Sequence, residues 1–147
     1  MDITDGDGSA SVTQNLNVNV TALNDDPYIS GSLPSDVTVI EDTMGFVDLS
    51  SISFNDVDAG NNLIQVTLST STGGRLWASS DFDVMVFGSG FTTMTLQGGV
   101  SDLNNFFSSA FRFNYLHGTP HTNGDNADTI QITVNDLGNT GAVSYTH

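Results

Sequence analysis

The sequence predicts an all-β fold, a Greek-key β-sandwich of about seven strands with one short helical turn. Valine, isoleucine and threonine, which favour strands, make up about a quarter of the 147 residues. Lysine is absent and there is a single glutamate, Glu41. Because long amphipathic helices are usually rich in lysine, glutamate and alanine, this composition excludes a helical bundle. A chain of this length has room for one main core.

Short apolar segments separated by glycine-rich and asparagine-rich turns mark the expected strands. Within them, apolar and polar residues tend to alternate with the two-residue period of a strand that has one solvated face. We expect strands at residues 12–22, 37–40, 46–54, 63–70, 83–87, 91–96, 110–116 and 129–135. Between residues 101 and 107, a capping serine precedes apolar residues at a spacing of three, which predicts one helical turn.

Segment 12–22 carries the most regular alternation. Val12, Leu16, Val18 and Val20 occupy even positions, and threonine or asparagine fills every odd position. The segment ends just before the run Asn24-Asp25-Asp26-Pro27, in which the proline lacks an N–H donor. We therefore place a boundary between two packed units at this run.

The two ends of the chain resemble each other, which predicts a repeat. Residues 5–12 (DGDGSASV) align without gaps on residues 136–143 (DLGNTGAV), an offset of 131 residues. We expect residues 1–23 to be the last strand of a preceding repeat, residues 24–35 to be a linker, and residues 36–147 to be a domain truncated before or within its own last strand.

A truncated last strand would leave an open slot at a sheet edge. Segment 12–22 has the pattern of a strand that could fill such a slot by strand exchange, within one molecule or between two copies. Both alternatives remain open from the sequence.

The charge of the chain restricts its partners. There are 17 acidic and 2 basic residues, which gives a formal net charge of -15. This field repels phosphate, so nucleic acid and anionic membrane surfaces are poor partners and cations are favoured. No apolar run approaches the roughly 18 residues that span a bilayer, so we expect no membrane insertion. Cysteine is absent, so disulfides do not stabilise the fold.

The acidic residues gather in short loops next to the expected strands. These loops contain Asn24-Asp25-Asp26, Glu41-Asp42, Asn55-Asp56-Val57-Asp58, Asp125 with Asp128, and Asn135-Asp136. Carboxylate and amide oxygens are the ligands that Ca²⁺ binds in sets of about six to eight. Aspartate and asparagine also form turns without a metal, which is the interpretation we prefer for Asp81 and Asp102. The repeated pairing of acids in the other loops favours calcium sites.

The order of these motifs resembles a cadherin repeat. Residues 36–69 (DVTVIEDTMGFVDLSSISFNDVDAGNNLIQVTLS) resemble its first half, with an extended segment ending in glutamate and a later Asp-x-Asp loop. The run Asn24-Asp25-Asp26-Pro27 resembles the linker between such repeats, and residues 133–138 (TVNDLG) resemble a late strand and its ligand loop. Residues 102–106 (DLNNF), together with a later strand containing Tyr115, make the chain most similar to the cadherin-like repeats of giant bacterial surface adhesins.

The resemblance implies a cadherin-like or immunoglobulin-like sandwich that serves as a calcium-binding extender or adhesion module of a cell-surface or secreted protein. Ca²⁺ at the junctions between repeats would stiffen the array, and neighbouring repeats of the same protein would be the partners. By position, the implied metal ligands of the linker junction are Asn24, Asp25, Asp26, Asp56, Asp58 and Asp136. Glu41 would belong to a different site, at the opposite end of the domain.

Catalysis has little support in the sequence. No G-x-S-x-G or H-E-x-x-H motif occurs. His117 and His121 are four residues apart, but Gly118 and Pro120 prevent the helix that would bring both rings to one face. We therefore expect a protein that is not an enzyme.

Glycan binding through exposed aromatic rings is the alternative function. Trp77 follows a Gly-Gly turn near the start of a strand and is the main candidate, and Tyr28, Phe82, Phe87 and Phe91 are further ones. The competing interpretation places most of the aromatic rings in the core. It applies to Phe87, Phe91, Phe111, Phe113 and Tyr115.

Overall fold

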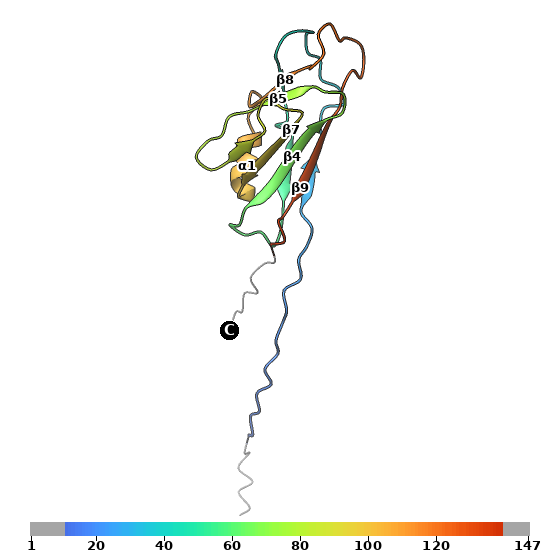
Figure 1. Ribbon diagram of the computed structural model, residues 1–147. Helices are drawn as coiled ribbons and strands as arrows, with labels where there is room; N and C mark the ends of the chain where they lie inside the picture. The colour runs from blue at the N-terminus through green and yellow to red at the C-terminus, as the bar shows by residue number, and fades with distance from the viewer. Residues whose placement is uncertain (1–10, 140–147) are drawn as a thin grey trace, which may run out of the picture.

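The structure, a computed structural model, describes residues 11–139 as an all-β fold with one short helix (Figure 1). The elements are β1 (Tyr28–Gly31), β2 (Gly45–Val47), β3 (Ile52–Asn55), β4 (Ile64–Thr70), β5 (Arg75–Trp77), β6 (Met85–Phe87), β7 (Thr93–Gly98), α1 (Val100–Phe107), β8 (Phe113–Leu116) and β9 (Ile130–Asn135). All strand pairs are antiparallel. The predicted all-β class is confirmed, with nine strands in the described part of the chain instead of about seven.

The strands form three sheets. β1 pairs with β3, β8 lies between β2 and β5, and the largest sheet has the order β6-β7-β4-β9. The central strand β4 alternates as predicted, since Ile64, Val66 and Leu68 are fully buried while the residues between them are partly exposed. Helix α1 contacts both β3 and β7, so it closes the core between two sheets.

Aromatic side chains fill the centre of the core. Phe54, Phe106, Phe107 and Phe113 are essentially inaccessible to solvent. The ring of Phe107 lies 4.8 Å from that of Phe54 and 4.7 Å from that of Phe113, measured between centroids. Each such contact stabilises the core beyond simple burial by about 1 kcal/mol.

The side chain of Asn104 fastens helix α1 to strand β3. Its Oδ1 accepts a hydrogen bond from the Phe54 N–H at 2.7 Å, and its Nδ2 donates to the Phe54 carbonyl at 2.9 Å. The amide therefore satisfies both backbone groups of a buried residue. Asn104 is the first asparagine of the DLNNF motif, so this contact gives that motif residue a structural role.

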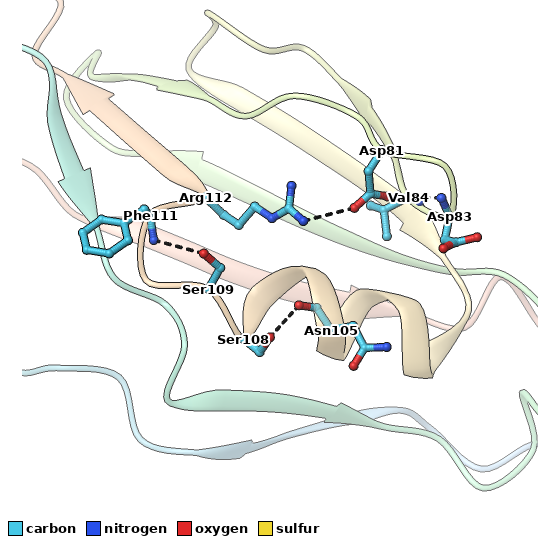
Figure 2. Close-up of polar contacts among 8 residues, drawn as sticks. All are labelled: Asp81, Asp83, Val84, Asn105, Ser108, Ser109, Phe111 and Arg112. Atoms are coloured by element: carbon cyan, nitrogen blue, oxygen red, sulfur yellow. Dashed lines mark hydrogen bonds and ion pairs between the residues drawn. The ribbon is translucent and has the colours of Figure 1, made fainter.

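Helix α1 is longer than predicted and begins differently. It has eight residues, and its N-cap is Gly99, with no side-chain cap, instead of Ser101. At its other end Ser108 Oγ donates to the Asn105 carbonyl (Figure 2). Beyond the helix, Arg112 contacts Asp81 at 3.3 Å (Figure 2). The Arg112 guanidinium also lies 4.4 Å from the centroid of the Phe106 ring.

The predicted strand 46–54 is divided into β2 and β3. Asp48 Oδ1 accepts hydrogen bonds from the Ser50 hydroxyl at 2.6 Å and from the Ser50 N–H at 2.9 Å. These bonds lower the pKa of the Asp48 carboxyl and hold a turn in the middle of the predicted strand. As a result, β2 and β3 pair in different sheets.

Two predicted strands are absent from the described part of the chain. No strand forms at residues 12–22, which lead away from the domain (Figure 1), or at residues 37–40. The alternation is present in both segments, but a strand also requires a hydrogen-bonded neighbour, and neither segment is paired within residues 11–139. The five other predicted strands are present, with ends that differ by at most three residues.

Two short strands were missed. β1 lies inside the predicted linker 24–35 and pairs with β3, so strand pairing of the domain begins at Tyr28. β5 pairs with β8 and ends at Trp77. Both have four residues or fewer, too few for a periodic pattern to be distinguished from a turn. The part of the repeat alignment at residues 1–10 and 140–147 lies outside the described residues.

A network of hydrogen bonds to Asp128 joins the β4–β5 turn to the segment that precedes β9. Oδ1 accepts from the N–H groups of Ser71 (2.9 Å), Thr72 (2.8 Å) and Thr129 (2.8 Å) and from the Ser71 hydroxyl (2.9 Å). Oδ2 accepts from the Gly74 N–H at 3.0 Å and the Tyr115 hydroxyl at 2.9 Å. A side chain at Gly74 would collide with Tyr115 and Asp128, so only glycine fits this turn.

The network shifts two pKa values. Partial burial alone raises the pKa of the Asp128 carboxyl, but the donated hydrogen bonds outweigh it and hold the pKa well below its usual range. Burial, and then the contact with Asp128, raises the pKa of Tyr115. Asp128 is therefore an ionised structural residue.

Replacing Asp128 with asparagine should lower the free energy of unfolding by about 2 to 4 kcal/mol, because an amide NH₂ would face N–H donors and the charge-assisted bonds would be lost. Urea denaturation measures this change. Asp125→Asn is the matched control, since Asp125 is exposed in the same loop. Equal stability of the two variants would contradict the structural role.

The contribution of Asp128 should depend on pH in a defined direction. Its folded pKa lies below the value of about 3.9 for an unfolded aspartate, so the ionised form stabilises the fold above that value. This stabilisation is lost as the pH falls through the folded pKa. The stability difference between the wild type and Asp128→Asn should therefore shrink below about pH 4. Urea denaturation at several pH values measures this difference. A stability difference that grows as the pH falls would contradict the stabilising role of the ionised Asp128 carboxylate.

Candidate functional site

The segment that precedes β1 contacts two loops that are distant in the sequence, at the lower end of the domain in Figure 1. Asn24 Nδ2 donates to Asp136 Oδ2 at 2.5 Å, and the Asp25 N–H donates to Asp58 Oδ2 at 2.5 Å. Since Asn24 and Asp25 are adjacent, these bonds bring Asp58 and Asp136 close together. We call this group, completed by Asp56, the junction cluster.

Asp136 is the buried member of the junction cluster. Its side chain comes directly after β9 and is the one buried charged group among residues 11–139, at 7% exposure. Its Oδ1 accepts from the Gly138 N–H at 3.0 Å. The Gly138 bond, and after it the bond from Asn24, holds the pKa of this carboxyl below its ordinary value, so it is ionised at neutral pH.

Asp56 adds a second set of oxygens through the loop after β3. Its Oδ1 accepts from the N–H groups of Asp58 and Ala59, both at 2.8 Å. These bonds turn the chain so that both carboxylates of the Asp-x-Asp sequence belong to one loop. The two-residue spacing of Asp56 and Asp58 favours this local geometry.

Two oxygen atoms of the junction cluster are buried without a hydrogen-bond donor. They are Asn24 Oδ1 and Asp56 Oδ2, and they are the two such side-chain atoms found in the described part of the chain. A buried acceptor without a donor costs about 1 to 3 kcal/mol. Because calcium binds amide and carboxylate oxygens of this kind, the donor set fits that ion.

The structure does not bring every predicted ligand into the cluster. Asp26 is exposed, and no hydrogen bond joins its side chain to residues 11–139. The carboxylates of Asp56, Asp58 and Asp136 do not converge within 4.8 Å of one another as a set of three. Asn139, which the sequence did not single out, lies beside the cluster and donates from Nδ2 to the Leu63 carbonyl at 2.7 Å.

A second acidic group lies at the opposite, upper end of the domain in Figure 1. Glu41, Asp42 and His121 place one ligand atom each within 4.8 Å of one another, the single set of this kind among residues 11–139. His121 Nδ1 is 2.8 Å from Asp42 Oδ2, and all three side chains are exposed. Glu41 therefore lies apart from the junction cluster. No sequence pattern connects it with His121, which is distant in the chain.

The aromatic residues divide between the core and the surface. Phe113 and Tyr115 are buried as expected, but Phe87, Phe91 and Phe111 are exposed by 51%, 65% and 72%, so their assignment to the core was wrong. Phe87 lies on the edge strand β6 and Phe91 in the turn before β7. Phe111 instead packs edge-on against Phe46.

Trp77 is partly exposed and close to the turn that carries Phe91. It is the last residue of β5, and a side chain at Gly90 would lie 3.1 Å from its indole Nε1. Tyr28 is 56% exposed but on β1, in another sheet. Phe82 is fully exposed.

Comparison with models of protein families, with curated proteins and with solved structures finds no match to this chain. Within residues 11–139, no helix has the length and apolar character needed to cross a membrane.

Proposed function

We propose that the protein is a calcium-binding extender module of a cell-surface or secreted protein, and that the junction cluster is its calcium site. The observation that supports this most is the pair of buried oxygens, Asn24 Oδ1 and Asp56 Oδ2, that have no hydrogen-bond donor. Asn24 is bonded to the buried carboxylate of Asp136, and the chain has a net charge of -15. A divalent cation would satisfy both oxygens and neutralise the carboxylates around them.

The proposed ligands come from three separate segments. Asn24 would bind through its amide oxygen, and Asp56, Asp58 and Asp136 through carboxylates; Asp25 and Asp26 would add oxygens from the segment that precedes β1. An ion held by all three segments fastens residues 24–26 to the domain, which stiffens the connection to a preceding repeat. Glu41, with Asp42 and His121, would form a separate site at the far end, toward a following repeat.

The arrangement of sheets supports the finer fold proposal, a cadherin-like Greek-key sandwich. The β2-β8-β5 sheet and the β6-β7-β4-β9 sheet share one core, to which Phe113 and Leu96 contribute from opposite sides. In a sandwich, loops gather at the two ends of the molecule. Two acidic ends on one domain suit a module repeated along an extended array, without catalysis.

Calcium should raise the melting temperature of the wild-type chain relative to a chelator. One ion at 100 times its dissociation constant adds about 2.7 kcal/mol, which corresponds to several degrees for a domain of this size. Thermal melts monitored by circular dichroism, with excess Ca²⁺ and with EDTA, measure the shift. Equal midpoints in the two conditions would exclude the site.

The Asp56→Asn variant distinguishes the proposed role of Asp56 as a metal ligand from its role in the turn. Asparagine keeps the Oδ1 that accepts from Asp58 and Ala59, so the turn is preserved. In EDTA the variant should melt at or above the wild-type temperature, because a close negative charge is removed. In excess calcium, the variant should show little of the rise in melting temperature that calcium gives the wild type. The control is Asp83→Asn, an exposed residue next to β6; a full calcium shift in Asp56→Asn would argue against ligation.

Glycan binding is the second proposal, supported by the exposed Phe91 beside Trp77. A sugar ring would stack on such a surface. If the surface binds a polysaccharide, Trp77→Ala should weaken binding at least tenfold in a calorimetric titration, while Tyr28→Ala, in another sheet, should not. A wild type that binds no member of a polysaccharide panel would eliminate this function.

A further inference from the structure

One side of the domain carries a groove of about 500 Å³. The continuous segment 33–42 forms one wall, and residues 122–130 with Ile132 form the other. Its apolar lining includes Val47, Leu49 and Tyr115, which belong to the core. The groove therefore reaches the hydrophobic core of the domain.

Both walls of the groove offer backbone groups without a partner strand. β9 is an end strand of its sheet, paired with β4 alone among residues 11–139. Segment 36–40, in the other wall, has the alternating sequence of a strand but is not in a sheet. Ile130, Ile132 and Val134 of β9 pack against the core but are only partly buried, unlike the fully buried Val66 and Leu68 of β4. The groove thus has the features of a slot that accepts one β-strand.

Segment 12–22 has the properties of a strand that fits this slot. Its Val12, Leu16, Val18 and Val20 are 57% to 87% exposed, and they alternate with asparagine and threonine. The segment has no charge, although five acidic residues line the groove: Asp36, Glu41, Asp42, Asp125 and Asp128. A neutral strand rich in amide donors suits such an acidic lining.

The alignment of residues 5–12 with residues 136–143 agrees with this choice. By this alignment, segment 12–22 is the sequence counterpart of the residues from Val143 onward, which follow β9 in the chain. A strand of this type is therefore expected next to β9.

The geometry favours a segment from another molecule. Asn24 and Asp25 are bound at the end where β9 finishes, and residues 11–23 lead away from there (Figure 1). To enter its own groove, the segment would have to reverse at once and run parallel to β9. A segment from a second molecule can run antiparallel, as β4 does on the other edge of β9, and antiparallel pairing is the more stable arrangement.

We propose that segment 12–22 of one copy inserts as a strand into the groove between segment 36–40 and β9 of a second copy. Two copies can exchange their segments reciprocally in a closed dimer. The insertion buries the apolar face of the segment. It also provides backbone hydrogen-bond partners for β9 and for segment 36–40. It does not depend on calcium, so it can fail while the proposed calcium site stands, and the reverse.

Sedimentation equilibrium of the full chain tests the exchange. In EDTA and about 1 M sodium chloride, where the screening length is about 3 Å, repulsion between acidic copies is suppressed. The wild type should then associate reversibly with increasing concentration. Val18→Asp should raise the dissociation constant by more than about tenfold, because it places a charge against the apolar residues of the lining, such as Val47 and Leu49. Asn17→Asp adds the same charge on the opposite face of the segment and should associate like the wild type.

A peptide of residues 11–23 provides a second measurement that leaves the folded domain unchanged. It should dissociate the wild-type assembly by filling the groove, and the same peptide with Val18→Asp should not. A wild type that stays monomeric at all concentrations, or equal association of Val18→Asp and Asn17→Asp, would overturn the proposal.

Discussion

The lower end of this domain is shaped by carboxylate and amide oxygens that outnumber their donors. Asp136 is buried and ionised, and Asn24 and Asp56 each keep a buried oxygen without a hydrogen bond. With two basic residues in the whole chain, the protein cannot neutralise this group with its own side chains. We propose that a divalent cation balances these charges and fixes the segment before β1, because such an ion would supply charge and coordination together.

The contrast with Asp128 shows that the chain can satisfy a carboxylate when its role is structural. Asp128 receives hydrogen bonds from both the backbone and side chains, including the Tyr115 hydroxyl, and joins the β4–β5 turn to the approach to β9. Asp56 receives two bonds, both to one oxygen, and leaves the other free. This free oxygen distinguishes Asp56, a candidate ligand, from the fully bonded structural residue Asp128.

Periodicity predicted most of the fold, and its failures have local causes. Val66 and its neighbours in β4 alternate and are buried as expected, because a central strand has partners on both sides. The Asp48–Ser50 hydrogen bonds that divide β2 from β3 are invisible to a period-two pattern. The order of motifs placed Asp58 and Asp136 at one end, whereas the meeting of Asp42 with His121 results from the pairing of strands far apart in sequence and could not be predicted.

The most direct test of the calcium account is an amide chemical-shift map of the ¹⁵N-labelled full chain during titration with Ca²⁺. The account predicts saturable shifts of the Asp25, Asp58 and Gly138 amides, which donate to or adjoin the proposed ligands. The Phe87 amide in β6, at the opposite edge of the sheet from β9, should not move. Unchanged positions of the first three amides at millimolar calcium would contradict the central claim.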